Sequence, residues 1–397
     1  MNKKLVAIAV AGMLAAPLAA EAQTANVTLY GRLNFTVEAV TGDVLDPSAT
    51  QPTSCVGVGP NVRCRVVDPT VYRVSSNSSR LGVRGSESLG RGLTAIFQME
   101  SNVNADTGGG ILASRETFIG LQGGWGTAKI GIFLAPYDDL HPVFGNTPTL
   151  NTSILSTSSL WANGTQSKEN GGFDARQGNS LRYDSPNVAG FTGSVQFSTR
   201  DASAGQGGVA FGSNAEEKRH ANIFGASGFY RNGPVVVGVG YEQNNKLRGA
   251  QLDDRALAVV GSYNFGVVKV GGVYERLDYD TPSGSLKRDF YGVSATVPLG
   301  PGEFFAFYGR AEDGEGGAAN GTRVGSATGG VTKGANTSAD QWTISYTYPL
   351  SKRTLTYVGY HRINNDANAN YSFNINTYPV VNGGNPSGFV GGIVHFF

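Results

Sequence analysis

The sequence predicts an all-β chain: a transmembrane, antiparallel, up-and-down β-barrel of sixteen strands. Three observations support this fold. Apolar and polar residues alternate in many segments of about eight to twelve residues. The connections between these segments alternate between short and long. The chain also ends on an apolar, strand-like segment, Gly388 to Phe397. An unpaired apolar strand promotes aggregation, whereas a sheet that closes on itself has no free edge.

The N-terminal residues 1–22 have the pattern of a secretory signal peptide. Lys3 and Lys4 precede a mostly apolar segment that ends in the small-x-small sequence Ala20-Glu21-Ala22. An anchoring helix is disfavoured, because the apolar segment contains Pro17 and is shorter than the roughly 18 to 20 residues that a membrane span needs. We therefore expect residues 1–22 to be cleaved and residues 23–397 to form the barrel domain, exported through the periplasm.

The composition supports a membrane barrel. Glycine accounts for 57 of the 397 residues, about twice the usual share. The 31 basic and 30 acidic residues fall to 29 each once Lys3, Lys4 and Glu21 are removed with the leader. A balanced charge gives no support for nucleic-acid binding or for an acidic disordered tail. The mature length suits one large barrel better than a typical soluble domain.

The alternation is clearest at the start of the mature chain. From Asn26, residues such as Val27, Leu29 and Leu33 have one parity, and residues such as Thr28 and Arg32 have the other. A period of two predicts a strand with one apolar and one polar face. By this criterion strands are predicted at 26–37, 79–87, 92–101, 115–122, 127–133, 180–186, 190–198, 219–230, 234–242, 255–265, 267–277, 287–299, 303–312, 339–350, 354–364 and 388–397.

The connections divide into seven short turns and eight long links. The turns contain Gly, Pro, Asn or Ser, residues that tight turns favour, and lie at 88–91, 123–126, 186–189, 231–233, 266, 300–302 and 351–353. The long links are 41–78, 102–114, 134–179, 199–218, 243–254, 278–286, 313–338 and 365–387. This division is typical of outer-membrane barrels, which have short turns on the periplasmic side and long loops outside.

The basic residues within strands predict which face lines the channel. An arginine on the lipid side at mid-depth costs about 2 to 4 kcal/mol, whereas the same arginine on a watery lumen costs little. We therefore expect five basic side chains to point inward: Arg32, Arg80, Arg84, Lys129 and Arg182. The strand 354–364 receives no assignment, because His361 and Arg362 lie on opposite parities. Aromatic residues near the strand ends predict girdles at the two membrane interfaces.

The third long link, about 46 residues from Leu134 to Asn179, is far longer than most loops. A sixteen-stranded barrel leaves an aqueous channel, and a loop of this length could fold back and narrow it. Its acidic residues would then stand opposite the inward arginines and produce a transverse electric field; they are Asp138, Asp139, Glu169 and Asp174. An ordinary solvated external loop is the alternative at this point.

Other chemistry has little support. Cys55 and Cys64 are predicted to form a disulfide in an oxidising compartment, because their spacing matches no metal motif. The four histidines lie in no catalytic or metal-binding motif, so no catalytic residue, metal or cofactor is predicted. An outer-membrane barrel enzyme of the lipase or protease type remains an alternative, since such a site has no obligatory sequence motif.

Five segments in order resemble the Gram-negative general porins, most closely their β-proteobacterial branch. They are Val27-Thr-Leu-Tyr-Gly-Arg32, Ser79-Arg-Leu-Gly-Val-Arg-Gly-Ser-Glu87, Asn179-Ser-Leu-Arg-Tyr-Asp-Ser-Pro186, Tyr348-Pro-Leu-Ser-Lys-Arg-Thr354 and Gly392-Ile-Val-His-Phe-Phe397. The resemblance implies a trimer of sixteen-stranded barrels with the long third loop folded into each channel. It also implies that Arg32, Arg80, Arg84 and Arg182 face Asp138 and Asp139, and that Phe397 acts as the membrane-insertion signal.

The resemblance includes one departure. Related chains often have Gly-Arg-Gln after the fifth strand, where this chain has Gly131-Ile-Phe133 and so lacks one basic wall residue. We therefore expect a passive, mildly anion-selective diffusion channel for small hydrophilic solutes and ions. It would be a homotrimer in the outer membrane, in contact with the lipid bilayer and lipopolysaccharide. A substrate-specific channel is a further alternative.

Overall fold

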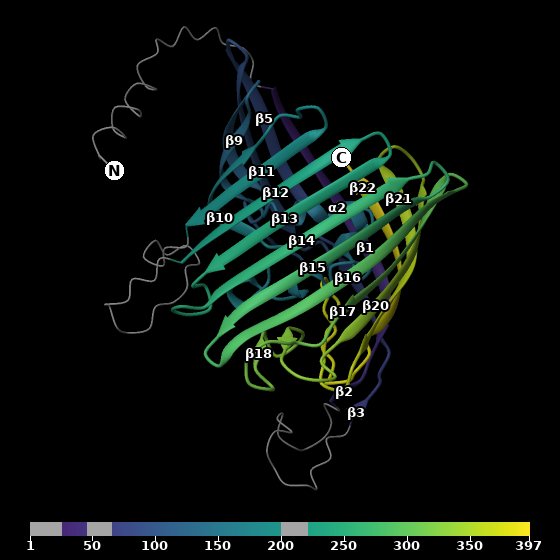
Figure 1. Cartoon of the computed structure of the whole chain (residues 1–397). Coiled ribbons are helices and arrows are strands. Elements are labelled where there is room, and N and C mark those ends of the chain that lie inside the picture. The colour runs from purple at the N-terminus through teal and green to yellow at the C-terminus, as the bar shows by residue number, and fades with distance from the viewer. Residues whose placement is uncertain (1–25, 46–65, 200–220) are drawn as a thin grey trace.

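The computed structural model describes residues 26–45, 66–199 and 221–397, and these form a closed antiparallel β-barrel (Figure 1). Sixteen strands of the described residues make up the wall. They are β1 (Asn26–Thr41), β5 (Arg80–Gly90), β6 (Leu93–Val103), β8 (Thr117–Gly123), β9 (Gly126–Leu134), β10 (Arg176–Asp184), β11 (Phe191–Thr199), β12 (Asn222–Asn232), β13 (Val235–Asn245), β14 (Asp253–Asn264), β15 (Lys269–Thr281), β16 (Gly284–Leu299), β17 (Gly302–Ala311), β20 (Ala339–Pro349), β21 (Thr354–Asn365) and β22 (Ser387–Phe396). The predicted fold class is confirmed.

The remaining elements are short. Within the described residues, β4 (Val71–Ser76) and β7 (Gly110–Ile111) extend the wall at the loop end, and β4 pairs with β1 beyond β5. Two small hairpins lie outside the wall: β2 (Val44–Leu45) with β3 (Val66–Val67), and β18 (Arg323–Val324) with β19 (Val331–Thr332). The helical turns are η1 (Asp138–Leu140), α2 (His141–Phe144), η2 (Leu150–Thr152), η3 (Trp161–Asn163) and η4 (Lys168–Asn170).

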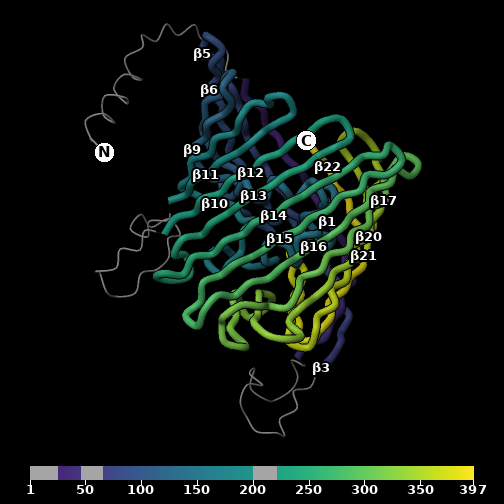
Figure 2. Tube along the Cα trace, viewed as in Figure 1, coloured from purple at the N-terminus to yellow at the C-terminus, as the bar shows by residue number. Residues whose placement is uncertain are grey.

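The last strand closes the ring against the first. β22 pairs antiparallel with β1 from Arg32↔Phe396 to Thr41↔Ser387. Gly31 and Phe397 then exchange backbone hydrogen bonds of 3.0 and 3.1 Å beyond the last pair. The strands run oblique to the barrel axis, and the C-terminus lies at the rim opposite β3 (Figure 2). Closure gives the apolar C-terminal segment a partner on both edges.

Side-chain exposure follows the predicted alternation. On β1, Leu29 is 63% exposed on the outer wall, whereas Arg32 is only 2% exposed on the inner side. On β22, the outward side chains are Phe389, Ile393, His395 and Phe397, as parity predicts. The outer wall is therefore largely apolar, and the backbone polar groups are bonded between strands, as a membrane-spanning sheet requires.

The seven predicted turns all lie between consecutive strands, but one predicted long link is wrong. The segment 278–286 is not a loop, because β15 continues to Thr281 and β16 begins at Gly284. Inward Tyr279 and Leu286 are buried, and outward Lys287 pairs with Asp278 at 3.7 Å. These contacts extend the hairpin, so the two strands are joined by a two-residue turn.

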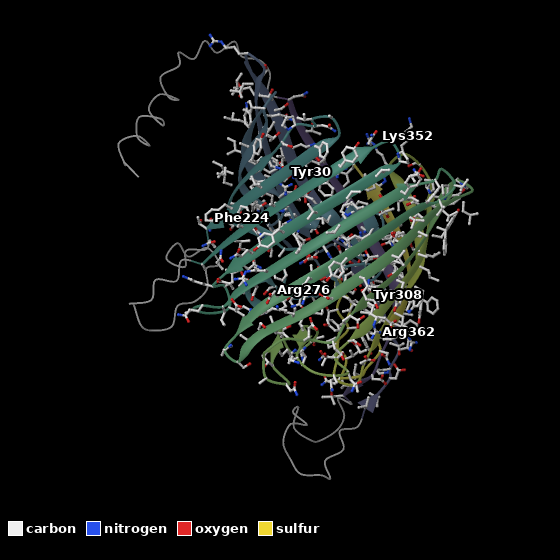
Figure 3. All side chains as sticks on the ribbon, viewed as in Figure 1. Tyr30, Phe224, Arg276, Tyr308, Lys352 and Arg362 are labelled. Atoms are coloured by element: carbon white, nitrogen blue, oxygen red, sulfur yellow. The ribbon has the colours of Figure 1, made fainter. Side chains whose placement is uncertain are left out.

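The structure also decides which face of β21 points inward. His361 is fully buried inside the barrel, 2.7 Å from the hydroxyl of Thr343, and Arg362 is exposed on the outer wall. Figure 3 shows Arg362, Tyr308 and Arg276 toward the rim that carries β2, β3 and β18, with Lys352 near the opposite rim. The outward arginines Arg276 and Arg362 therefore lie toward the loop end of the wall, near a membrane interface, where an arginine costs less than at mid-depth.

Three sequence predictions lie outside the described residues: the leader 1–22, Cys55 and Cys64. In the part of the chain that is described, no helix has the length and apolar character needed to cross a membrane.

Candidate functional site

The third long connection, residues 135–175 (here L3), lies inside the barrel. Its side chains include Tyr137, Leu140, Phe144 and Trp161, all completely buried. They pack against an inner wall that is itself apolar over β14 to β17, where the inward residues include Ala258, Val260, Val273, Leu277, Phe305 and Phe307. Full burial of one such side chain contributes roughly 1.5 to 3 kcal/mol. The hydrophobic effect therefore holds L3 in the channel, and an external loop is excluded.

Aromatic stacking organises the buried side of L3. The ring of Trp161 stacks on Tyr137 and on His141, each with centroids 5.1 Å apart. Phe144 contacts Trp161 at 5.7 Å and reaches Phe307 of the wall at 6.0 Å. Burial lowers the pKa of His141 to about 4, so this imidazole is neutral at physiological pH.

Polar contacts connect L3 to strands around most of the barrel. Glu275 on β15 accepts hydrogen bonds from the hydroxyl of Tyr137 at 2.9 Å and from the backbone N–H of Ala162 at 2.8 Å. Asp139 accepts a 2.7 Å bond from Arg182 Nη2 on β10. Further bonds join Arg32 to Thr152, Asn146 to Ser345, Gln341 to Leu160 and Thr157, and Tyr279 to Gly171.

A second connection also enters the barrel. The segment 366–386 (here L8), between β21 and β22, buries Tyr371 and Phe373 in the same apolar cluster as L3. Asn374 Nδ2 donates to Ser158 Oγ, and the backbone N–H of Asn374 donates to Ser159 Oγ at 3.2 Å. L3 and L8 are therefore joined inside the channel. No local sequence pattern predicted the inward fold of L8.

A cavity of about 330 Å³ lies between L3, L8 and the wall around β5, β6 and β10. Most of its charged lining residues lie opposite the apolar wall that L3 covers. The lining includes three arginines and four carboxylates: Arg80, Arg115, Arg176, Glu100, Glu116, Asp138 and Asp174. Asn151, Ser158 and Asn374 add neutral polar groups. We call this cavity the constriction, because residues of both inward-folded loops, L3 and L8, line it together with the wall.

The basic side of the constriction is organised around Glu100. One oxygen of this carboxylate, Oε1, accepts from Arg115 Nε at 2.5 Å and from Arg80 Nη1 at 3.2 Å. The other oxygen, Oε2, accepts from the hydroxyl of Tyr30 at 3.1 Å. One negative charge therefore holds two guanidinium groups, and a net positive charge remains at this wall. Charge-assisted bonds of this kind fix the side chains in place.

The acidic side is formed by L3. Burial and the neighbouring Asp139 raise the pKa of Asp138 to about 7. Burial, with the nearby Asp138, raises the pKa of Asp174 well above its usual value. Near neutral pH, Asp138 is therefore about half ionised, and the raised pKa of Asp174 favours its neutral form. At neutral pH the acidic side therefore carries less negative charge than its number of carboxyl groups suggests.

The predicted site residues occupy different positions in this arrangement. Arg80, Asp138 and Asp174 line the constriction together. Arg32 contacts L3 by donating a 2.9 Å hydrogen bond to the hydroxyl of Thr152. Arg182 forms an ion pair with Asp139 near the start of L3.

The other predicted residues lie away from the constriction. Lys129 faces inward but pairs with Asp184 at 2.8 Å. Arg84 lies over the ring of Tyr30 toward the turn end, 4.9 Å from its centroid. Glu169 lies on η4, within L3, and does not line the constriction.

Several lining residues were missed from the sequence. Arg115 stands at the boundary of a predicted strand, and Arg176 was assigned to the loop, although β10 begins at this residue. The register between β9 and β10 shifts between Gln177 and Ser180, which interrupts the alternation that would have identified Arg176 as inward. Glu100 could have been found, because it shares the parity of Gln98 and Asn102 on a predicted strand.

Across residues 26–45, 66–199 and 221–397, no three His, Cys, Asp or Glu side chains come together in a way that could hold a metal ion. The buried His361 contacts a threonine hydroxyl and the ring of Phe373. The arrangement is that of a charged passage through a barrel.

Comparisons with known proteins agree with this geometry. A family model described as "Gram-negative porin" matches residues 7–368. Outer membrane porin protein 32 of Delftia acidovorans is 28% identical over 375 residues, covering 90% of this chain and 88% of that protein. An outer membrane porin protein of Bordetella pertussis is 29% identical over 316 residues, covering 71% of this chain and 75% of that protein.

Solved structures show the same fold. The anion-selective porin from Comamonas acidovorans superposes with a TM-score of 0.70 at 24% identity, covering 94% of this chain and all of that one. OmpF of Salmonella typhi superposes with a TM-score of 0.58 at 16% identity, covering 94% and 98%. The fold, the constriction and the relatives are those of an outer-membrane diffusion channel and not of an enzyme. The chain belongs to the Gram-negative porin family.

Proposed function

We propose that the constriction makes this porin a mildly anion-preferring channel for small hydrophilic solutes and ions. The observation that carries the proposal is the arrangement of Arg80, Arg115 and Arg176 in one cavity with Asp138 and Asp174. At neutral pH the three guanidinium groups stand against Glu100, Glu116 and a partly ionised Asp138, while burial raises the pKa of Asp174 and favours its neutral form. A small positive excess remains, and lining charge is a main source of selectivity in such pores.

Planar-bilayer recording tests this proposal. Purified protein should insert in stepwise conductance increments, and in a salt gradient the reversal potential should indicate a preference for chloride over potassium. Absence of steps would contradict the channel, and a reversal potential of the opposite sign would contradict the anion preference. Saturable current block by one solute would favour a substrate-specific channel instead.

We infer that the protein functions as a homotrimer. The outer wall exposes large apolar side chains on many strands, including the strongly exposed Leu29 and Ile130. One related barrel structure, OmpT of Vibrio cholerae, is described as a trimer form, although at 14% identity it is a guide to fold only. Mass photometry of the detergent-extracted protein should give three times the protomer mass. A single protomer mass would contradict the trimer.

We also propose the processing and membrane contacts expected from the sequence. Residues 1–22 act as a cleaved leader, Cys55 and Cys64 form a disulfide, and the terminal Phe397 serves as the insertion signal. The outer wall contacts the bilayer and lipopolysaccharide. N-terminal sequencing should begin at Gln23, and non-reducing peptide mapping should recover both cysteines in one linked species.

A further inference from the structure

A third loop packs against L3 and L8 without lining the constriction. It is the connection 312–338 between β17 and β20 (here L7), all of which lies within the described residues. It contains the hairpin of β18 and β19, which lies at the loop end of the barrel beside β16 (Figure 1). Val324 and Val331 of this hairpin are only 2% and 1% exposed and belong to the apolar cluster that contains L3 and L8. L7 is therefore part of the core that the loops form.

Hydrogen bonds fix the base of L7 to the wall. The backbone of Glu315 exchanges hydrogen bonds of 2.8 and 2.9 Å with the backbone of Lys287 on β16. On the other side of the loop, Asp313 Oδ1 accepts from the backbone N–H groups of Thr337 at 2.7 Å and Ser338 at 2.8 Å, directly before β20. The two ends of L7 are therefore held at the wall, and its middle extends to L3.

One side chain of L3 is bonded twice to the backbone of L7. Gln166 is buried, and its Nε2 donates to the carbonyl of Thr328 at 2.8 Å. Its Oε1 accepts from the backbone N–H of Ser326. The side-chain amide thus bonds two backbone groups of L7 that lie two residues apart. A buried amide that loses such partners is left unsatisfied, so this contact resists separation of the two loops.

A second contact holds L3 five residues further on. A Cβ atom added to Gly171 would lie 2.5 Å from Cγ1 of Val324, so only a residue without a side chain fits beneath this valine. The carbonyl of Gly171 accepts a 2.8 Å hydrogen bond from the hydroxyl of Tyr279 on β15. The backbone of L3 is therefore enclosed at this point between the wall and L7.

The residues that L7 contacts are close in sequence to residues that line the constriction. On L3, Gln166 and Gly171 lie between Ser158 and Asp174, which both line it. On L8, Asn370 accepts from the backbone N–H of Gly329 at 3.0 Å and donates through Nδ2 to the carbonyl of Ala327 at 2.9 Å. Asn370 precedes the lining residue Asn374 by four positions. L7 therefore holds both inward loops next to their lining residues.

We propose that L7 is a strap that holds L3 and L8 in place and so limits the fluctuation of a constriction that it does not line. Because one hairpin contacts both loops, L3 and L8 should become mobile together when L7 is loosened. The opposite arrangement, in which L7 only covers the mouth of the barrel, would leave L3 equally well ordered after such a change. The proposal concerns the order of the loops and does not depend on which ions the channel prefers.

Hydrogen–deuterium exchange of the full folded protein, measured by mass spectrometry, tests the strap. Gln166→Met keeps the length of the side chain and removes both bonds to L7. Amides of L3 between 160 and 175 should then exchange roughly 5- to 30-fold faster, the factor that corresponds to one or two lost hydrogen bonds. Val324→Ala, a change within L7 itself, should also accelerate exchange in L3 and in L8 around Asn370. Exchange of the strand amides should stay at the wild-type rate, which shows that the barrel is intact.

Ser283→Ala is the matched control. Ser283 lies in the turn between β15 and β16 and accepts from the backbone N–H of Ala319 in L7 at 3.2 Å, so the variant removes a contact of L7 with the wall and none with L3 or L8. Exchange in L3 should be unchanged. Faster exchange confined to L7 in Val324→Ala, or wild-type exchange of L3 in Gln166→Met, would overturn the strap and leave L7 as a cover of the barrel mouth.

Single-channel recording of the same variants tests the effect on the passage. Gln166→Met and Val324→Ala should show more frequent conductance fluctuations than wild type and Ser283→Ala. Their reversal potentials should stay at the wild-type value, because no charge changes. Wild-type current in both variants, despite faster exchange in L3, would overturn the control of the constriction by L7. The exchange data are independent of ion preference, so failure of the strap is distinguishable from failure of the channel proposal.

Discussion

Glu275 and Arg288 form an ion pair inside the barrel, with Glu275 Oε1 2.8 Å from Arg288 Nη2 and both side chains fully buried. The two residues lie on adjacent strands, β15 and β16. The second oxygen of Glu275 accepts from Tyr137 and Ala162 of L3, and Arg288 lies 6.0 Å from the ring of Tyr371 in L8. One ion pair therefore contacts both loops that narrow the channel.

Removal of Glu275 should loosen L3. In Glu275→Ala, Arg288 loses its counter-charge, and breaking a buried pair in this way costs about 3 to 5 kcal/mol. Tyr137 and Ala162 also lose their acceptor. We expect larger and noisier single-channel currents and a lower thermal transition of the folded protein. The exposed Glu87→Gln at the turn end is a suitable control.

A double variant separates the effect of the two buried charges from the effect of the hydrogen bonds between Glu275 and L3. Glu275→Leu with Arg288→Met removes both buried charges, so it should recover much of the thermal stability. It cannot bond Tyr137 or Ala162, so the larger current should persist. Wild-type current in both the single and the double variant would show that Glu275 does not position L3.

The arginines of the constriction should control ion selectivity. A unit charge about 6 Å from a permeating ion contributes roughly 0.7 kcal/mol in a water-like medium, which corresponds to about a threefold change. Arg176→Gln should therefore lower the chloride-to-potassium permeability ratio about threefold, as measured from reversal potentials. Arg84→Gln, a lumen-facing change outside the constriction, should have a much smaller effect. Equal effects of the two variants would contradict the assigned role of Arg176.

Selectivity should also depend on pH near neutrality. The charged groups around Asp138 are Asp139, Glu116, Arg176 and Arg182, and burial is the main cause of its raised pKa of about 7. Below pH 7 this carboxyl group is protonated and neutral, whereas above pH 7 it becomes negative. Anion preference should therefore decrease as the pH rises from about 6 to 8.

Asp138→Asn provides the control for this titration. The variant keeps the shape of the side chain and removes its charge, so the reversal potential should change little over the same pH range. It should also match the wild-type value at the acidic end. His141, with a pKa of about 4, stays neutral over this range and contributes no titration. A wild-type pH dependence retained in Asp138→Asn would assign the effect to another group.

The contact between L8 and L3 should limit the size of the opening. Asn374→Ala removes the amide that bonds Ser158, a contact worth about 0.5 to 1.5 kcal/mol. Conductance should rise modestly, and selectivity should stay near the wild-type value because no charge changes. Asn368→Ala is a matched control, since Asn368 is also in L8 but donates to the carbonyl of Ala335 in the connection before β20 and does not line the constriction. An unchanged conductance in Asn374→Ala would show that L8 does not narrow the channel.

Most of the wall could be predicted from the alternation of side chains, but much of the constriction could not. The inward positions of Arg32, Arg80 and Arg182 follow from parity, because alternate residues of a strand face opposite sides. The inward position of Arg176 could not be predicted, because the register shift after Gln177 interrupts that parity. The inward fold of L8 has no local signal, since it depends on how Phe373 packs against side chains from other segments.

The sequence by itself determined the barrel, its strand count, its closing strands and, apart from the tight turn between β15 and β16, the division of connections into turns and loops. These features depend on a period of two and on local turn residues, which a single segment carries. Only the tertiary structure decided that Arg80, Arg115 and Arg176 share one cavity, that L8 joins L3 and that Arg362 faces outward. These relationships join residues far apart in the chain, and they follow from closure of the ring and packing inside it.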